Sequence, residues 1–259
     1  MNSNVISQNG SFVSSSEALF KKAQKVMYSN KSYMCSLSEL PVTVSTHLFY
    51  SLVRPILTYN CEIWNMDIYK AHDNATLRAT KSNSQVHHFN FLDKVHNKFC
   101  KYILGLKKWA SNIASRSELG RLPIDCFIKT QSLLYEDRIL ADDTPLILKE
   151  CYSLSKSLHE KGTYSWFSYV NHVRYENKIN HSNEEFIKRN RNKLKRKYKN
   201  AVEQEYLDIY NKKLESIDDK SKLLLFKTLT TEYKLEFDLK YPDNAIRKLI
   251  CQFLGIERG

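Results

Sequence analysis

The chain has 259 residues, enough for one or two domains, and 42% of them are apolar, which allows a sizeable core and argues against wholesale disorder. Forty lysines and arginines against 28 aspartates and glutamates give a net charge of +12, which suits a polyanionic partner or an acidic surface. Only six glycines and five prolines occur, so we expect long helices with short connections.

The start of the chain is polar and lacks the basic and then apolar order of a secretion signal, and no apolar run approaches the ~20 residues that a membrane span needs. The six cysteines stand singly, without a CxxC pair, so we expect reduced thiols rather than a zinc site. We therefore expect an intracellular chain, nuclear or cytoplasmic and not secreted, with no membrane partner, no bound metal and no cofactor.

The first helix is expected from Ser15 to Tyr28, because Ser14 and Glu17 fit a capping box ahead of apolar residues at helical spacing. The segment LFYSLVRPILTYNCEIW, from Leu48 to Trp64, carries apolar residues at helical spacing on both sides of Pro55. Because proline interrupts a helix, this segment predicts a helix that is kinked or split there.

Three further helices follow, each marked by a residue at one end. A helix from Leu92 to Leu104 should end at Gly105, and another should begin at Pro123. Pro145 begins the third, which Gly162 should end. The expected buried residues of this third helix are Ile147, Cys151, Leu154 and Leu158.

A short helix after Ser165 precedes a much longer basic helix near 184–216, and helical patterns continue beyond it. No segment alternates strictly between apolar and polar residues, so the prediction is an all-α, multi-helix fold. We expect a helical segment at 1–66, a polar linker at 67–90, a second helical region at 91–180, and the long basic helix with C-terminal helices at 181–259.

The string RILADDTPLIL contains two adjacent aspartates, Asp142 and Asp143, which could hold the divalent metals of a polymerase. They lie between two helical segments, whereas the aspartates of polymerases lie in a hairpin between strands. We therefore favour stabilisation of a helix N-terminus over catalysis. His87, His88 and His96 have no ligand at metal-binding spacing and are interpreted as surface or interhelix histidines.

The segment FIKRNRNKLKRKYKNAV has the highest local charge, with eight basic residues and no acidic one. Like charges on about three helical turns repel one another, so a phosphate backbone alongside should stabilise them. A solvated helix face or a nuclear import signal is the alternative. Tyr198, Tyr206 and Tyr210 could stack on bases, but their spacing fits an apolar stripe better. The candidate nucleic-acid contacts are Lys188, Arg189, Arg191, Lys193, Lys195, Arg196, Lys197 and Lys199, with Lys101, Lys107 and Lys108 as a second basic group.

Six strings follow one another along the chain: NGSF with the helix after it, LFYSLVRPILTYNCEIW, KVHNKFCKYILGLKK, SELGRLPI, GTYSWFSYV and FLGIERG. In this order they resemble the region after the catalytic core in reverse transcriptases of non-LTR (LINE-type) retrotransposons. The chain departs from the family pattern at Asn60, where the family usually has glycine.

The resemblance implies that 1–66 is a thumb-like segment and 91–180 a connection domain, both of which grip the template-primer duplex. In that family the polymerase aspartates lie upstream of the PILTY string, so Asp142 and Asp143 are not the catalytic pair. The chain would then be a non-catalytic fragment of an RNA-directed DNA polymerase, not an enzyme as it stands. Its partners would be RNA or an RNA–DNA hybrid and the upstream polymerase core. The alternative is a helical interaction module whose basic helix docks on an acidic partner or self-associates.

Overall fold

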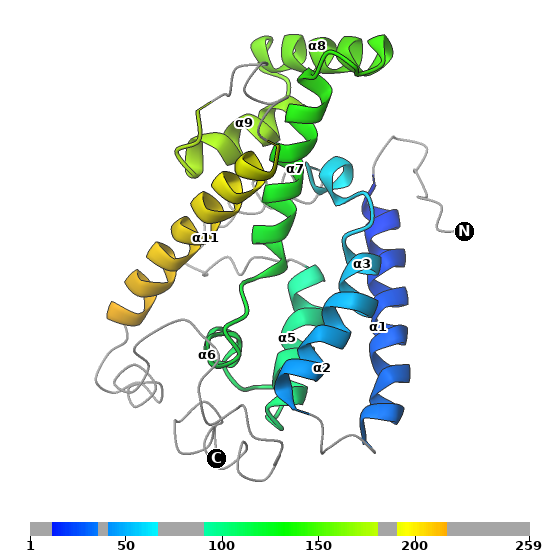
Figure 1. The fold of residues 1–259 in the computed structure, drawn as a ribbon, viewed down its shortest axis with the longest axis vertical. Helices are drawn as coiled ribbons and strands as arrows, with labels where there is room; N and C mark the ends of the chain where they lie inside the picture. The colour runs from blue at the N-terminus through cyan, green and yellow to red at the C-terminus, as the bar shows by residue number, and fades with distance from the viewer. Residues whose placement is uncertain (1–11, 36–40, 67–90, 181–190, 217–259) are drawn as a thin grey trace. The chain divides into compact units, whose positions relative to one another are not determined.

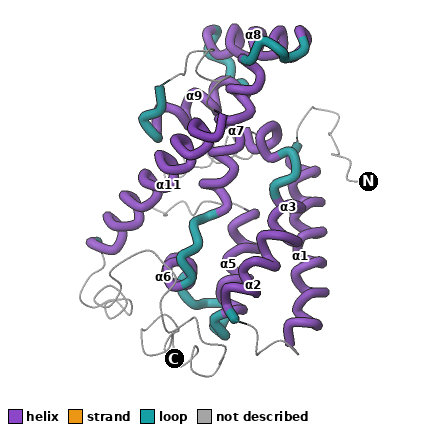
Figure 2. Tube along the Cα trace, in the orientation of Figure 1, coloured by secondary structure: helices purple, strands orange, loops and turns teal. Residues whose placement is uncertain are grey.

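The computed structural model describes residues 12–35, 41–66, 91–180 and 191–216. Figure 2 shows that the regular structure of these residues is helical and that no strand occurs among them. The predicted all-α fold is therefore confirmed for the described part of the chain. The expected linker at 67–90, the first residues of the basic helix at 184–190 and the helical patterns beyond 216 lie outside the described residues.

The chain divides into two compact units, and neither is a continuous stretch of sequence. The first unit combines Met1–Ser16, Asn60–Asn90 and Asp125–Tyr206. The second combines Glu17–Tyr59, Phe91–Ile124 and Leu207–Gly259. The division into 1–66, 67–90, 91–180 and 181–259 stays a prediction.

The core of the second unit forms where the segment around Phe49 packs against a helix that follows later in the sequence. The ring of Phe49 stacks on Phe99 with a centroid distance of 4.4 Å and on His96 at 5.2 Å. Leu57 and Val95 are also fully buried. The helices of this unit (Figure 1) are α1 (Val13–Cys35, from Glu17 onward), α2 (Val42–Leu48), the π-helical segment η1 (Phe49–Val53), α3 (Arg54–Leu57), α5 (Phe91–Ile103) and α6 (Asn112–Glu118).

The first helix, α1, is longer than expected at both ends. It begins at Val13, so Ser14 lies inside its first turn and is not the N-cap that the capping box required. The helix also continues past Tyr28, to Cys35. The apolar spacing located the helix, and its bounds were the part that the sequence did not determine.

The sequence predicted a kinked or split helix at Pro55, and the structure has a π-helical segment just before this residue instead. Pro55 lies in the first turn of α3, where its missing amide is not needed, and the residues just before it widen into the π-helical η1. The amide of Arg54 bonds to the carbonyl of Phe49, five residues back. A proline ring crowds the carbonyl four residues before it, and a wider turn relieves that contact. The helix therefore passes through Pro55 and ends only at Leu57.

The turn that follows α3 depends on Asn60, whose φ of 53° lies in the left-handed region. Asparagine enters that region more easily than any residue except glycine. Asn60 is thus conformationally compatible with the glycine that the resembled family has at this position. A short helix at 61–66 begins directly after it.

Both predicted glycine stops are confirmed. Gly105 has a φ of 68°, and the amide of Leu106 bonds to the carbonyl of Lys101 across the end of α5. Gly162 has a φ of 75°, and the amide of Thr163 bonds to Leu158 in the same way. These are Schellman endings, which need a left-handed residue and so favour glycine.

In the first unit, the helix at 61–66 is joined to a later helix by two side-chain contacts. Asn65 donates to the Tyr169 hydroxyl at 2.8 Å, and Trp166 Nε1 donates to the carbonyl of Glu62 at 2.7 Å. Trp64 is fully buried. The other helices of this unit are α7 (Ile124–Leu140, from Asp125 onward), α8 (Leu146–Glu160), α9 (Trp166–Glu176) and the part of α11 (Arg191–Glu215) up to Tyr206.

The burial expected for α8 is wrong. Its bounds match the prediction, but Ile147 is 67% exposed, Leu154 is 63% exposed and Leu158 is 37% exposed, and Cys151 is exposed as well. No residue of α8 is buried. The spacing of apolar residues shows which face of a helix is apolar, but it does not show whether another element covers that face. We call Ile147, Cys151, Leu154 and Leu158 the α8 stripe.

Candidate nucleic-acid interface

The basic residues of α11 point away from the interior of the first unit because the opposite side of the helix is held inside it. Leu194, Tyr198 and Val202 are buried and recur at intervals of four residues, so they form one side of the helix. The basic residues that fall on the other sides are exposed: Lys193, Lys195, Arg196, Lys197 and Lys199. We call these five residues the α11 basic face. Tyr198 belongs to the buried stripe and is not available to stack on a base.

Most of the α11 basic face has no acidic neighbour in the part of the chain that the structure describes. Lys199 lies 3.7 Å from Glu203, one turn further along the helix. Among the described residues, no ion pair involves Lys193, Lys195, Arg196 or Lys197. Of the other predicted contacts in this run, Lys188 and Arg189 lie outside the described residues, and Arg191 is described only as the first residue of α11.

A buried charge network holds α11 in place. Arg174 of α9 places its Cζ atom 5.5 Å from the centre of the Tyr198 ring. The same guanidinium donates from Nε to Glu136 at 2.6 Å and from Nη2 to Asp137 at 3.2 Å. The Tyr152 hydroxyl donates to Glu136 as well, at 2.9 Å. Four helices of the first unit, α7, α8, α9 and α11, therefore contribute to one polar network.

Burial shapes the ionisation of this network. It raises the pKa of Asp137, although the Tyr198 hydroxyl and the Arg174 charge act in the opposite direction. Burial acts to lower the pKa of Arg174, but Glu136 and Tyr198 together outweigh it through charge and hydrogen bonding, and the pKa is raised. The arginine therefore stays charged. No sequence pattern indicated this network, because Glu136 and Asp137 resemble solvated residues of an ordinary helix.

The second basic group, in the other unit, is only partly available. Lys101 is 9% exposed, and its Nζ donates to the backbone carbonyl of Lys108 at 2.8 Å. Burial and the charge of Arg116 lower its pKa. Lys101 thus ties the end of α5 to the following loop, and the expectation that it contacts nucleic acid is not supported by its position. Lys107 and Lys108 are exposed, and Lys107 Nζ lies 5.3 Å from the centre of the half-exposed Trp109 ring.

Three arginines that the sequence did not single out lie in the second unit, two of them at Tyr50 and the third near His96. Arg54 and Arg121 both lie over the Tyr50 ring, and Arg116 donates from Nη1 to Asn97 Oδ1. The four-residue spacing of Tyr50 and Arg54 is visible in the sequence. Arg121 lies 67 positions after Arg54 in the sequence, so only the fold brings it to the ring.

The aspartate pair lies in the turn between α7 and α8, where the resemblance placed it. Asp142 and Asp143 are exposed, and the N-cap of α8 is Pro145, which has no side-chain capping hydrogen bond. Neither aspartate is therefore the N-cap, and the expected stabilisation of the helix N-terminus by their charge stays a prediction. No group of three or more possible metal ligands occurs within the described ranges. His96 is buried, as an interhelix histidine should be, while His87 and His88 are outside the described residues.

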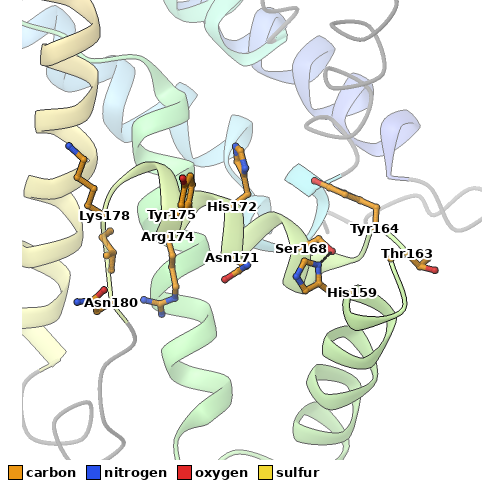
Figure 3. Close-up of a pocket in the computed structure, with 12 residues that line it drawn as sticks. His159, Thr163, Tyr164, Ser168, Asn171, His172, Arg174, Tyr175, Lys178 and Asn180 are labelled. Atoms are coloured by element: carbon orange, nitrogen blue, oxygen red, sulfur yellow. Dashed lines mark hydrogen bonds between the residues drawn. The ribbon is translucent and has the colours of Figure 1, made fainter.

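An open pocket of about 830 Å³ lies along α9 in the first unit. Figure 3 shows Asn171 and Arg174 on one side of the helix and His172 and Tyr175 on the other. His159 Nδ1 lies 2.9 Å from Ser168 Oγ, but this serine is also part of the capping box that begins α9 at Ser165. The histidine–serine pair therefore has a structural role, and the pocket contains none of the predicted contacts that the structure describes.

Among the described helices, none combines the length and the apolar character that crossing a membrane requires. Comparison with known proteins finds no matching family model, no matching curated protein and no matching solved structure.

Proposed function

We propose that the chain belongs to a non-LTR retrotransposon reverse transcriptase, outside its catalytic core, and that it holds nucleic acid through the α11 basic face. The ligand is the sugar–phosphate backbone of RNA or of an RNA–DNA hybrid. The upstream polymerase core catalyses the reaction, and this chain binds the nucleic acid without taking part in catalysis.

The observation that carries the proposal is the orientation of α11. Its buried stripe fixes one side of the helix in the interior, so the lysines and the arginine on the remaining sides cannot turn inward. Lys193, Lys195, Arg196 and Lys197 are then four neighbouring cations without an acidic partner among the described residues. A row of phosphates neutralises such a group and releases its own counterions, which favours binding.

The resemblance supports the same proposal from the sequence. Six strings occur in the family's order. Gly105, Gly162 and Asn60 belong to three of these strings, and each has a left-handed backbone conformation. The family's polymerase aspartates precede the PILTY string, which agrees with a holding role for this part.

The decisive experiment measures binding of the full chain to a fluorescent RNA–DNA hybrid from about 50 to 200 mM salt, because phosphate contacts give a steep salt dependence. The test variant is Lys193→Gln/Lys195→Gln/Arg196→Gln/Lys197→Gln. We expect the magnitude of the slope of log K against log salt to decrease by about one unit for each contact between a basic side chain and a phosphate that the substitutions remove. Affinity at the lowest salt should fall by more than about tenfold.

The matched control is Lys21→Gln/Lys25→Gln/Lys156→Gln/Lys161→Gln, which removes the same charge from exposed positions on α1, on α8 and at the C-cap of α8. If both variants show the same reduction in slope, binding follows net charge and the α11 basic face is not the site. If the wild-type chain does not bind the hybrid even at the lowest salt, the proposed function is wrong.

A self-associating helical module is the second candidate, and the exposed α8 stripe favours it. Sedimentation with and without the hybrid separates the two candidates. A chain that forms dimers in the absence of nucleic acid, and whose hybrid binding is insensitive to salt, would favour the second.

A further inference from the structure

Two arginines of the second unit meet on one tyrosine ring. The Cζ atom of Arg54 lies 4.6 Å from the centre of the Tyr50 ring, and that of Arg121 lies 5.1 Å from it. Both distances are within the reach of a cation–π contact. All three residues are half-buried, so each keeps part of its surface in solvent. We call them the arginine–tyrosine cluster.

Local backbone features position the cluster. Tyr50 and Arg54 lie four residues apart at the π-helical η1, a type of turn found frequently at functional sites. Arg121 follows α6, where Gly120 takes a φ of 59° and the Arg121 amide bonds to the Arg116 carbonyl at 2.8 Å. The backbone hydrogen bonds of the helix at Arg54 and of the turn at Arg121 therefore fix the positions of both arginines.

Positive charge accumulates at this point of the second unit. Burial lowers the pKa of Arg54; Tyr50 acts in the opposite direction, and the charge of Arg121 acts in the same direction as burial. Burial also lowers the pKa of the neighbouring His96 to about 3, and the charges that add to this effect are those of Arg116, Arg121 and Arg54. The combined field of these arginines attracts an anion to this part of the unit.

The donors of the cluster suit an oxyanion, and the proposed function makes that oxyanion a phosphate. A guanidinium is a planar fork that can donate two parallel hydrogen bonds to a phosphate, and two such forks lie on one ring. The phenol adds a third kind of donor. Burial raises the pKa of Tyr50, so its hydroxyl keeps its proton at neutral pH.

We propose that Arg54, Arg121 and Tyr50 bind a backbone phosphate of nucleic acid, as a contact in the second unit that is additional to the α11 basic face of the first. This inference rests on the proposed function. It places a phosphate contact within LFYSLVRPILTYNCEIW, the segment that otherwise serves as scaffold.

The test compares three variants of the full chain in the hybrid-binding titration. Arg54→Gln/Arg121→Gln should lower the salt slope by about one to two units, because the two substitutions remove up to two charges from the phosphate site. Arg54→Lys/Arg121→Lys keeps the charge but not the fork, so it should keep the slope and bind more weakly. Tyr50→Phe keeps the ring and should also bind more weakly with an unchanged slope.

The control is Lys25→Gln/Lys98→Gln, which removes two exposed charges of the same unit. Circular dichroism melts of all variants confirm that they fold. Should the glutamine variant unfold, the lysine and phenylalanine variants still decide the matter, since wild-type affinity in both would overturn the inference.

Three results separate this inference from the proposed function. Loss of binding in the α11 variant, with the cluster variants equal to the control, overturns the inference alone. Absence of hybrid binding by the wild-type chain overturns both. If the cluster variants lose binding to polyglutamate but keep their affinity for the hybrid, the cluster recognises acidic protein, and the phosphate assignment is wrong.

Discussion

Individual buried side chains decide how the two units respond to their surroundings. In the first unit, Arg174 is buried against two carboxylates, Glu136 and Asp137. A buried ion pair adds little to stability when complete, but removal of one partner leaves an uncompensated charge in the interior. In the second unit, His96 is buried beside arginines and stacks on Phe49. A change in the ionisation of either buried residue should therefore change the stability of its unit.

His96 should make the chain sensitive to acid. Its pKa is lowered to about 3 by burial and by Arg116, Arg121 and Arg54, whereas in the unfolded chain the pKa is near the ordinary histidine value of 6.5. The folded state therefore excludes a proton that the unfolded state binds, and stability is present above pH 6.5 and lost as the pH falls toward 3. Between about pH 7.5 and pH 5, this residue alone should lower the free energy of unfolding by about 2 kcal/mol.

The measurement is urea unfolding at both pH values for the wild type and for His96→Phe, which keeps a ring against Phe49. The variant should lose most of the pH-dependent difference. His47→Gln, at an exposed histidine of α2, should leave it unchanged. An equal pH dependence in His96→Phe and the wild type would show that His96 titrates normally in the folded protein.

At the scale of elements, backbone geometry explains how the segment from Leu48 to Trp64 accommodates its proline and positions its side chains. The π-helical η1 accommodates Pro55, and the left-handed Asn60 separates α3 from the helix at 61–66. The first feature also positions Tyr50 relative to Arg54. A regular α-helix without the π-helical turn would place one of them at a different angle around the axis, since residues in a π-helix and an α-helix are spaced differently.

Asn60 offers a direct test of this geometry. The left-handed region costs a residue with a Cβ atom about 1–2 kcal/mol, and asparagine less. Asn60→Ala should therefore lower the free energy of unfolding by about 1 kcal/mol, while Asn60→Gly should leave it unchanged or raise it slightly. Urea midpoints of the two variants check this. Equal destabilisation by glycine and alanine would mean that the Asn60 side chain, and not its backbone, is what matters.

At the scale of the whole molecule, charge and apolar surface are unevenly distributed among the described elements. The net charge of +12 includes the α11 basic face, and the α8 stripe belongs to the same unit but carries no charge. A basic surface predicts a polyanion as partner, and an exposed apolar stripe predicts contact with another protein surface. The two features can therefore serve different partners.

The α8 stripe predicts self-association of the chain at high concentration. Ile147→Lys/Leu154→Lys should abolish it and leave the melting temperature nearly unchanged, because both side chains are already more than half exposed. Sedimentation velocity over a range of concentrations measures the effect, with Lys156→Gln/Lys161→Gln at the end of the same helix as the control. A wild-type chain that stays monomeric at every concentration would contradict the prediction.

The sequence by itself determined the helical class, the glycine stops at Gly105 and Gly162, and the side of α11 that carries its charges. All of these depend on local periodicity and on backbone preferences that act within a few residues. Only the tertiary structure decided that Lys101 is buried, that the α8 stripe is exposed, and that Arg121 joins Arg54 on the ring of Tyr50. Burial and long-range pairing depend on which elements pack together, and no local pattern of residues contains that information.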